Sequence, residues 1–397
     1  MGWLGLDDTD HIGGGCTTHA LFELIQQLPK KYVVSSQRLV RLYPFAKQRT
    51  RGNAAVAIKI EGEDYTDLLL HLDYWWDEKI APLKGKLTQS KQYIRPQSPT
   101  DPGMVWFESK PDEATYWKCV REEVSIDEIA IADKSWGGHG RIGATAAVSW
   151  PAEEYTYEAI SWRTAESVNS AAQRKVDLSR INELDSNLDT FMSRDLRSKS
   201  VLISPRGNCP VLFGIRARTE SSAITACNYL IDSDLTEAVE GHMIFKTNQA
   251  TDDHLGDDMI GLVDEIQIKK RGTVKICCGD GMNLMAFAES GDLKNLAQWL
   301  KKGDEIAYNG LLSSDRTIHL ERLRLLSSTP VRVRPKCKNC NVTMKSMGAN
   351  QDLRCPKCKV RMADSWQELP RKPPFSGWVQ PPCDSMRHLA KPIVWNQ

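Results

Sequence analysis

Residues Gly5 to Thr18 read GLDDTDHIGGGCTT, and this stretch organises the expected fold of the first part of the chain. A short apolar run precedes the carboxylates Asp7, Asp8 and Asp10, and a helical pattern begins at His19. The carboxylates and glycines therefore lie where a strand passes into a helix. Clustered carboxylates are oxygen ligands suited to Mg²⁺, and glycine-rich turns before a helix suit phosphate. The pattern indicates a metal–nucleotide site, with a capped, Asp-rich turn as the alternative.

A second glycine-rich segment, SWGGHGRIGA at Ser135–Ala144, precedes an alanine-rich helical pattern. Its glycines would allow backbone N–H groups to approach a phosphate closely, although the spacing matches neither the Walker nor the Rossmann fingerprint. Arg49 and Arg51 lie in a polar loop and could supply guanidinium groups to phosphate oxygens. A plain tight turn and surface salt bridges are the alternatives for these features.

The order of expected elements predicts several domains of mixed class, α/β followed by α+β. Strands alternate with helices over 1–150, and strands separated by helices over 153–262 suit a ferredoxin-like sandwich. A densely polar segment, 247–254, follows a strand in this second region. Polar side chains at a strand end could line a site, but many strands simply end in polar loops.

The C-terminal part of the chain predicts an OB-fold barrel followed by a zinc ribbon. Five short strands with one helix between the third and fourth span 263–328. In 331–368, fourteen residues separate two C-x₂-C pairs, one residue under the usual zinc-ribbon range, and their four thiolates suit tetrahedral Zn²⁺. The four expected zinc ligands are Cys337, Cys340, Cys355 and Cys358. A proline-rich, extended tail, 369–397, is expected to dock through its apolar residues.

Charge is unevenly distributed along the 397 residues. Residues 331–397 hold 13 Lys and Arg against 4 Asp and Glu, whereas 1–330 hold 39 against 47. The net charges of +9 and −8 indicate a polyanionic partner gripped at the C-terminal end, with a solvated basic tail as the alternative. The seven remaining cysteines are scattered, and neither a signal peptide nor a membrane-length apolar run is present. We expect a cytoplasmic protein without a membrane partner.

The motifs together resemble archaeal tRNA(Ile) 2-agmatinylcytidine synthetases. The resemblance is co-linear and runs through nearly the whole chain, including the barrel and the four cysteines. Its motifs are GLDDTD, GGGCTTH, KQRTRGNAAV (Lys47–Val56), SWGGHGRIGA, TYEAISWR (Thr156–Arg163), CPVLFGIRA (Cys209–Ala217), FKTNQATDDHL (Phe245–Leu255) and RHLAKP (Arg387–Pro392).

The resemblance implies an AMP-forming, ATP-dependent ligase with agmatine and tRNA(Ile) of CAU anticodon as substrates. The base carbonyl at position 2 of the first anticodon cytidine is phosphorylated, and the amine of agmatine displaces the phosphate. The first domain becomes a kinase-like module, with Thr18 as phosphoacceptor and ATP, Mg²⁺ and Zn²⁺ as cofactors. Asp7, Asp8 and Asp10 match the acidic metal–ATP loop, with Asp7 and Asp8 on magnesium.

The resemblance also assigns the remaining site residues. The ATP-binding set is Gly13, Gly14, Arg49, Arg51, Gly137, Gly138, Gly140 and Gly143. The expected agmatine pocket is Glu158, Asn248, Gln249, Thr251 and Asp252, with Asp253 as a further candidate carboxylate. The barrel and the zinc ribbon are expected to hold the tRNA.

Two positions depart from the family pattern. Ala250 stands where glycine is usual, which constrains the backbone, and Arg141 stands in the glycine loop where an apolar residue is usual. Two other functions remain open: an ATP-dependent enzyme acting on a different RNA, and a non-enzymatic RNA-binding adaptor. The adaptor gives the acidic loop no role.

Overall fold

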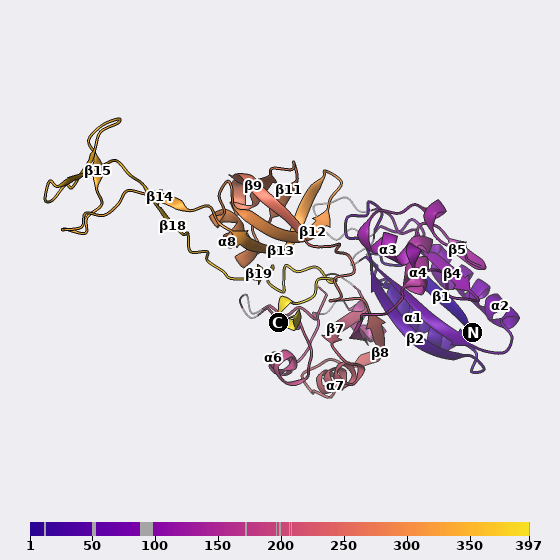
Figure 1. The fold of residues 1–397 in the computed structure, drawn as a ribbon. Coiled ribbons are helices and arrows are strands. Elements are labelled where there is room, and N and C mark those ends of the chain that lie inside the picture. The colour runs from indigo at the N-terminus through magenta and orange to yellow at the C-terminus, as the bar shows by residue number, and fades with distance from the viewer. Residues whose placement is uncertain are drawn as a thin grey trace. The chain divides into compact units, whose positions relative to one another are not determined.

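The computed structural model describes residues 1–11, 13–49, 53–87, 98–170, 173–195, 197, 200–205, 207 and 209–396. The chain forms two compact units (Figure 1). The first comprises residues 1–256 together with 382–397, and the second comprises 257–381. The last residues of the chain therefore belong to the same unit as its beginning.

One mixed sheet of eight strands forms the framework of the first unit, in the order β5-β4-β1-β3-β2-β8-β6-β7. Its strands are β1 (Gly2–Asp7), β2 (Val33–Arg41), β3 (Ala54–Glu61), β4 (Gly103–Phe107), β5 (Lys134–Gly137), β6 (Thr156–Arg163), β7 (Val211–Ala217) and β8 (Val239–Thr247). Strands thus alternate with helices over both 1–150 and 153–262, as expected.

Strands from the two regions expected as separate domains meet in this sheet. β2 pairs with β8 in parallel, with Arg38 opposite Lys246 and Leu39 opposite Thr247. The other pairings in the sheet are antiparallel. The kinase-like and ferredoxin-like assignments, with their boundary near residue 150, stay predictions.

Helices cover both faces of the sheet because β1 and β3 bury alternate side chains on opposite sides. Val56 and Ile58 pack with α1 (Thr17–Gln27) and α2 (Thr66–Trp75), whereas Ala55 and Ala57 pack with α3 (Ala114–Arg121) and α4 (Arg141–Ser149). The other helical segments are α5 (Ala165–Asn169), α6 (Leu178–Asn187), α7 (Glu220–Ile231), a π-turn (Trp76–Ile80) and short 3₁₀ turns at Ala81–Leu83, Ile126–Glu128 and Ile393–Asn396. Within the described ranges, no helix combines the length and apolar character needed to span a bilayer.

The second unit contains the expected five-stranded barrel. Its strands are β9 (Met259–Ile268), β10 (Val274–Cys278), β11 (Asn283–Ala286), β12 (Glu305–Leu312) and β13 (Thr317–Ser327). They follow the order β11-β10-β9-β12-β13, and a parallel pairing of β11 with β13 closes the barrel. Helix α8 (Asp292–Trp299) lies between the third and fourth strands, a 3₁₀ turn (Lys270–Gly272) joins the first two, and β19 (Trp378–Val379) extends β13. This part of the prediction is confirmed.

The ribbon consists of short strands around two cysteine-bearing loops. A two-stranded stem, β14 (Val331–Val333) with β18 (Gln367–Leu369), leads to a three-stranded sheet of β15 (Lys345–Ser346), β16 (Leu353–Arg354) and β17 (Arg361–Met362). Few apolar side chains are buried here beyond the cysteines, Met344 and Leu353. A domain with so small a core needs a metal to hold it together.

Candidate functional site

The acidic loop begins at the last residue of β1. Asp7, Asp8 and Asp10 are 8%, 8% and 9% exposed, so three carboxylates are withdrawn from water within four positions. Asp8 has a φ of 62°, a left-handed conformation that bulky residues avoid. The chain therefore turns sharply at Asp8, and this turn places Asp7, Asp8 and Asp10 in one loop.

Backbone N–H groups hold these carboxylates in place. The N–H of Asp101 donates to Asp8 Oδ2 at 2.9 Å, and the N–H of Thr17 donates to Asp10 Oδ1 at 3.1 Å. The N–H of Asp8 donates to Asp7 Oδ1 at 2.6 Å. Asp8 Oδ1 is buried and has no hydrogen-bond partner among the described residues. One carboxylate oxygen is thus left for a ligand.

Burial and mutual repulsion favour the protonated forms of two of these acids. The pKa of Asp7 is raised well above its usual range, first by burial and then by the charge of Asp8. Burial also raises the pKa of Asp8 to about 7, with further contributions from Asp10 and Asp101. A divalent cation would remove this penalty, and carboxylate oxygens are the donors that Mg²⁺ prefers. The residues fit that ion.

The second glycine-rich segment packs directly against the acidic loop, where side chains would not fit. A Cβ at Gly143 would lie 1.9 Å from Asp7 Oδ2, and one at Gly140 would lie 2.6 Å from the Asp7 carbonyl oxygen. A Cβ at Gly138 would lie 2.1 Å from Asp101 Oδ2. Gly137 has a φ of 76°, which favours glycine. Close packing accounts for these glycines independently of any phosphate.

A small cavity of about 50 Å³ lies where the two loops meet. Asp7, Asp8, Gly140, Gly143 and Arg49 line it, all five from the predicted set. Its apolar wall includes Leu42, Tyr43, Val124 and Ile142. Its carboxylates offer oxygen ligands for a metal ion, which in turn binds phosphate oxygens.

Other predicted residues of the first domain do not line this cavity. Gly13 and Gly14 form a tight turn on His11, whose ring nitrogen Nδ1 accepts from the N–H of Gly13 at 3.0 Å. Thr18 is buried at the start of α1, with its hydroxyl 3.2 Å from the sulfur of Cys16. Thr17, by contrast, joins the acidic loop through Thr9 and Asp10. Arg51 lies outside the described residues.

Arg141, one of the two departures from the expected family pattern, turns back onto its own loop. Its Nε donates to the Gly138 carbonyl at 3.2 Å, and its Nη1 donates to Ser135 at 3.4 Å. The guanidinium group therefore supports the glycine-rich segment.

The polar segment after β8 forms a buried network with β2 and β6. Asn248 exchanges two hydrogen bonds with the backbone of Arg41, at 2.7 and 3.0 Å. Glu158 lies 3.3 Å from the guanidinium of Arg41 and accepts from Gln249 Nε2. Thr251 donates to the Asn248 carbonyl at 2.9 Å. The structure thus brings Glu158, Asn248, Gln249 and Thr251 together, and their polar groups bond mainly to protein.

The acidic pair of this segment, Asp252 and Asp253, also has protein partners. Asp252 accepts from the N–H of Lys391 at 2.7 Å, and Asp253 accepts from the Tyr116 hydroxyl. Burial raises the pKa of Asp253. Both carboxylates therefore fasten the polar segment to other parts of the first unit.

The C-terminal motif RHLAKP packs along the polar segment through backbone hydrogen bonds. The N–H groups of Ala250 and Asp252 donate to the carbonyls of His388 and Leu389, each at 2.9 Å. His388 Nδ1 lies 3.0 Å from Gln249 Oε1. The tail docks further through Trp395, whose ring centroid lies 4.9 Å from that of Phe191. The expected docking of the tail is therefore present in the structure.

A larger cavity, of about 390 Å³, lies beside this contact. Basic side chains dominate its polar lining: Arg41, Arg49, Arg387, His254 and His388. Leu42, Arg49 and Asn53 line both cavities, so the two are neighbours. Sequence reasoning gave Arg41, Arg387 and His388 no role. The signal for Arg387 and His388 was an Arg–His pair in the otherwise proline-rich tail.

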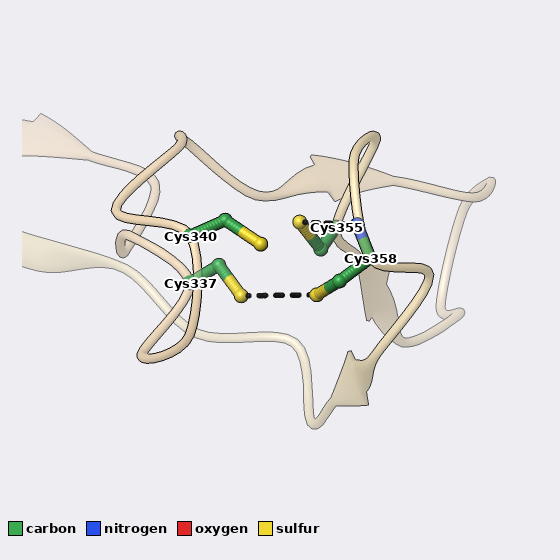
Figure 2. Close-up of side chains that lie close together, drawn as sticks. All are labelled: Cys337, Cys340, Cys355 and Cys358. Carbon is green, nitrogen blue, oxygen red and sulfur yellow. Dashed lines mark hydrogen bonds between the residues drawn. The ribbon is translucent and has the colours of Figure 1, made fainter.

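The four ribbon cysteines form the expected metal site (Figure 2). Their sulfur atoms all lie within 4.8 Å of one another, and Cys337 and Cys358 are 3.5 Å apart. The side chains of the two loops point toward a common centre in Figure 2. Four thiolates fill the tetrahedral coordination of Zn²⁺ and leave no position for a substrate. This site is structural.

Comparison with known proteins identifies the family. Sequence models of three TiaS domains match the chain: the TiaS TCKD domain over 3–69, the TiaS FLD domain over 138–254, and the TiaS C-terminal zinc ribbon domain over 334–372. The isoleucine-tRNA 2-agmatinylcytidine synthetase TiaS of Methanocorpusculum labreanum is 31% identical, with 98% of this chain and 96% of the relative covered. That of Pyrococcus horikoshii is 32% identical over the same shares.

Solved TiaS structures agree with the fold over nearly its full length. Apo TiaS, an isoleucine-tRNA agmatidine synthetase, superposes with a TM-score of 0.82 at 26% identity, covering 99% of this chain and 97% of the other. A complex of TiaS with its isoleucine tRNA, AMPCPP and agmatine gives 0.78 at 25% identity, covering 99% and 96%. Domain content, full-length identity and fold thus agree, and the chain belongs to the TiaS family.

Proposed function

We propose that the chain attaches agmatine to position 2 of the first anticodon cytidine of an isoleucine tRNA, in an ATP-dependent, AMP-forming reaction. One observation carries the proposal: the chain matches synthetases named for this activity over 98% of its length. A related structure holds the isoleucine tRNA, an ATP analogue and agmatine. The CAU anticodon and a cytoplasmic location complete the proposal.

The phosphoryl-transfer centre of this proposal is the small cavity between the acidic loop and the glycine-rich segment. Asp7 and Asp8 would hold Mg²⁺, with Asp10 fixing the loop, and Arg49 would contact the triphosphate. Mg²⁺, when bound, neutralises charge on the transferring phosphoryl group. The raised pKa values of Asp7 and Asp8 support this role, because both acids gain most from a cation. The first region then acts as the kinase-like module.

The remaining nucleotide contacts in the proposal come from the two glycine-rich turns and from Arg51. Gly140 and Gly143 bring backbone close to Asp7, and Gly137, Gly138, Gly13 and Gly14 join the proposed set from the same two turns. Thr18 is the proposed phosphoacceptor. Its place on the first turn of α1 favours phosphate, since helix N-termini attract anions.

Agmatine is assigned to the ferredoxin-like region, beside the polar segment. A dication needs carboxylate or carbonyl partners, and Glu158, Asn248, Gln249, Thr251 and Asp252 supply both kinds of oxygen. Of these, Glu158 is the carboxylate that pairs with Arg41, which lines the larger cavity. The barrel and the basic zinc ribbon would hold the tRNA, in line with the +9 net charge of 331–397.

The proposal is tested by incubating the protein with radiolabelled agmatine, ATP, Mg²⁺ and a transcript of the isoleucine tRNA with a CAU anticodon. Label should enter the RNA only when ATP is present, and Asp8→Ala should abolish incorporation. A transcript carrying uridine at the first anticodon position is the matched control. ATP turnover without label in the RNA would favour the alternative enzyme. RNA binding that survives Asp8→Ala, without ATP turnover in the wild type, would favour the adaptor.

A further inference from the structure

The larger cavity contains one histidine whose ring is both exposed and tethered. His388 is exposed and lines the cavity. Its backbone is fixed by the carbonyl contact to Ala250, and its Nδ1 is fixed by Gln249. A side chain held at one ring nitrogen while the rest of the ring faces a cavity is placed to act on a ligand.

The hydrogen bonds around Gln249 determine which nitrogen of His388 carries the proton. Gln249 Nε2 donates to Glu158, so Oε1 is the amide atom 3.0 Å from the imidazole. An amide oxygen only accepts, and therefore His388 Nδ1 must donate. In the neutral ring this leaves Nε2 with its lone pair. Within the described ranges the ring has no second hydrogen-bond partner.

The charges around His388 keep the ring neutral. The pKa of His388 is lowered well below its usual range, first by the charge of Arg41 and further by that of Arg216. The groups facing it from neighbouring elements are Arg41 of β2, Arg49, Arg216 of β7, His254, Arg387, and Glu158 of β6 through Gln249. Arg41 already pairs with Glu158, which reduces the effect of that negative charge on the ring. The cavity therefore favours bases over their conjugate acids.

We propose that His388, through Nε2, accepts the proton that the primary amine of agmatine must lose when it attacks the phosphorylated base. This inference rests on the function proposed above. The amine nitrogen forms a bond to C2 of the pyrimidine, and the bond from C2 to the phosphate oxygen breaks. The phosphate leaves with the bonding electrons. The nitrogen loses one proton to Nε2, and the imidazolium passes it to the departing phosphate or to water.

The arginines that line the cavity serve the same step. The phosphorylated base carries negative charge, which guanidinium groups attract with matching geometry. The positive field also disfavours an ammonium group, so the attacking amine is held in its nucleophilic, neutral form. The cavity thus combines attraction for the intermediate with two means of deprotonating the nucleophile.

The decisive variant is His388→Asn, because the asparagine amide can still donate to Gln249 from near the Nδ1 position. It removes only the basic nitrogen. General-base catalysis is typically worth about 10²–10⁴-fold, so agmatine transfer at neutral pH should fall by at least about 100-fold. Phosphate transfer from ATP to the RNA, measured without amine, should stay within about threefold. Agmatine transfer within about threefold of wild type would overturn the proposal and leave His388 a positioning residue.

Two further measurements keep the test independent of how His388→Asn folds. A weakly basic primary amine, whose nitrogen releases its proton more readily after attack, should reduce the defect of His388→Asn to less than about tenfold; an undiminished defect would overturn the proposal. In the wild type with saturating agmatine, the amine-transfer rate should fall in acid, at a pH well below the ordinary histidine pKa of 6.5, and a rate independent of pH would overturn the proposal. If the wild type transfers no agmatine at all, the proposed function fails instead.

Discussion

Asp8 combines burial, an unusual backbone conformation and the charge of its neighbours. Its pKa is about 7 in the folded protein, against an ordinary value of 3.8. Because the folded-state pKa is raised, ionisation destabilises the fold. The penalty is absent below about pH 4, grows as the pH rises to about 7, and is constant above. At about 1.4 kcal/mol per pKa unit it approaches roughly 4 kcal/mol.

The first prediction concerns Asp8→Asn, which removes the charge and keeps an oxygen for the N–H of Asp101. Without Mg²⁺ the variant should be more stable than wild type by a few kcal/mol at about pH 8, and equally stable near pH 4. Urea unfolding at both pH values measures the difference. Mg²⁺ should stabilise the wild type at the higher pH and have little effect on the variant.

The exposed Asp127→Asn is the control for this experiment, and its stability should be unchanged at either pH. A wild type that unfolds at the same urea concentration as Asp8→Asn at both pH values would show that Asp8 carries no such penalty.

Ala250 occupies a position that glycine would fill more easily. Its φ of 55° is in the left-handed region, which costs an L-residue roughly 1–2 kcal/mol. Replacing a buried helical alanine, such as Ala226 in α7, with glycine should lower the free energy of unfolding by about 2 kcal/mol. Glycine has a lower helix propensity, and the methyl group is lost from the core. At position 250 the relief of strain offsets the lost methyl group.

The second prediction is therefore that Ala250→Gly stays within about 1 kcal/mol of wild type, whereas Ala226→Gly costs about 2 kcal/mol. Ala250→Val should be the most destabilising of the three, because a β-branched side chain tolerates this conformation poorly. Urea unfolding of the three variants ranks them. Equal losses for the two glycine variants would contradict the argument.

The two cysteine loops of the ribbon repeat one backbone design. In each, the first cysteine donates its N–H to the carbonyl five residues on, at 2.9 Å for Cys337 and 2.8 Å for Cys355. The residue after the second cysteine has a positive φ, 54° at Asn341 and 66° at Lys359. Asparagine tolerates this conformation, but lysine gains nothing from it.

The third prediction follows from this difference between the loops. Lys359→Gly should relieve strain of roughly 1 kcal/mol and slow zinc loss to a chelator, whereas Lys359→Val should accelerate it. Asn341→Gly is the matched control and should change zinc retention less. Zinc release is followed with a coloured chelator. A faster release from Lys359→Gly than from wild type would be the contradictory result.

Local signals predicted the elements, and long-range pairing lay beyond them. The barrel strands, α8 and the four cysteines could be predicted because alternation, helical spacing and C-x₂-C pairs are short-range patterns. The parallel pairing of Arg38 and Leu39 with β8 joins residues far apart in the chain, which periodicity does not encode. The same limit hid Arg41 and His388, whose roles arise from contacts across the whole first unit.

At the scale of the whole molecule, the chain leaves its first compact unit after residue 256 and returns to it at 382. The intervening unit, 257–381, holds the barrel and the zinc ribbon. The returning tail contributes His388, Leu389 and Lys391 to the hydrogen bonds of the polar segment. The first unit can therefore complete its fold only after the whole second unit has been synthesised, because residues 382–397 follow that unit in the chain.

The fourth prediction concerns a chain that ends at Pro381. Its second unit should be as stable as in the full chain, and its first unit should be less stable. Such a chain lacks the carbonyls that accept from Ala250 and Asp252, and leaves two buried or half-buried N–H groups unpaired, at about 1–3 kcal/mol each. Calorimetry should show a lower transition for the first unit and an unchanged, zinc-dependent transition for the second. A peptide of residues 382–397, added in excess, should raise the lowered transition. The same peptide carrying Trp395→Ala should do so less well, because Trp395 packs on Phe191. An unchanged first transition in the truncated chain would mean that the tail only rests on a unit already complete without it.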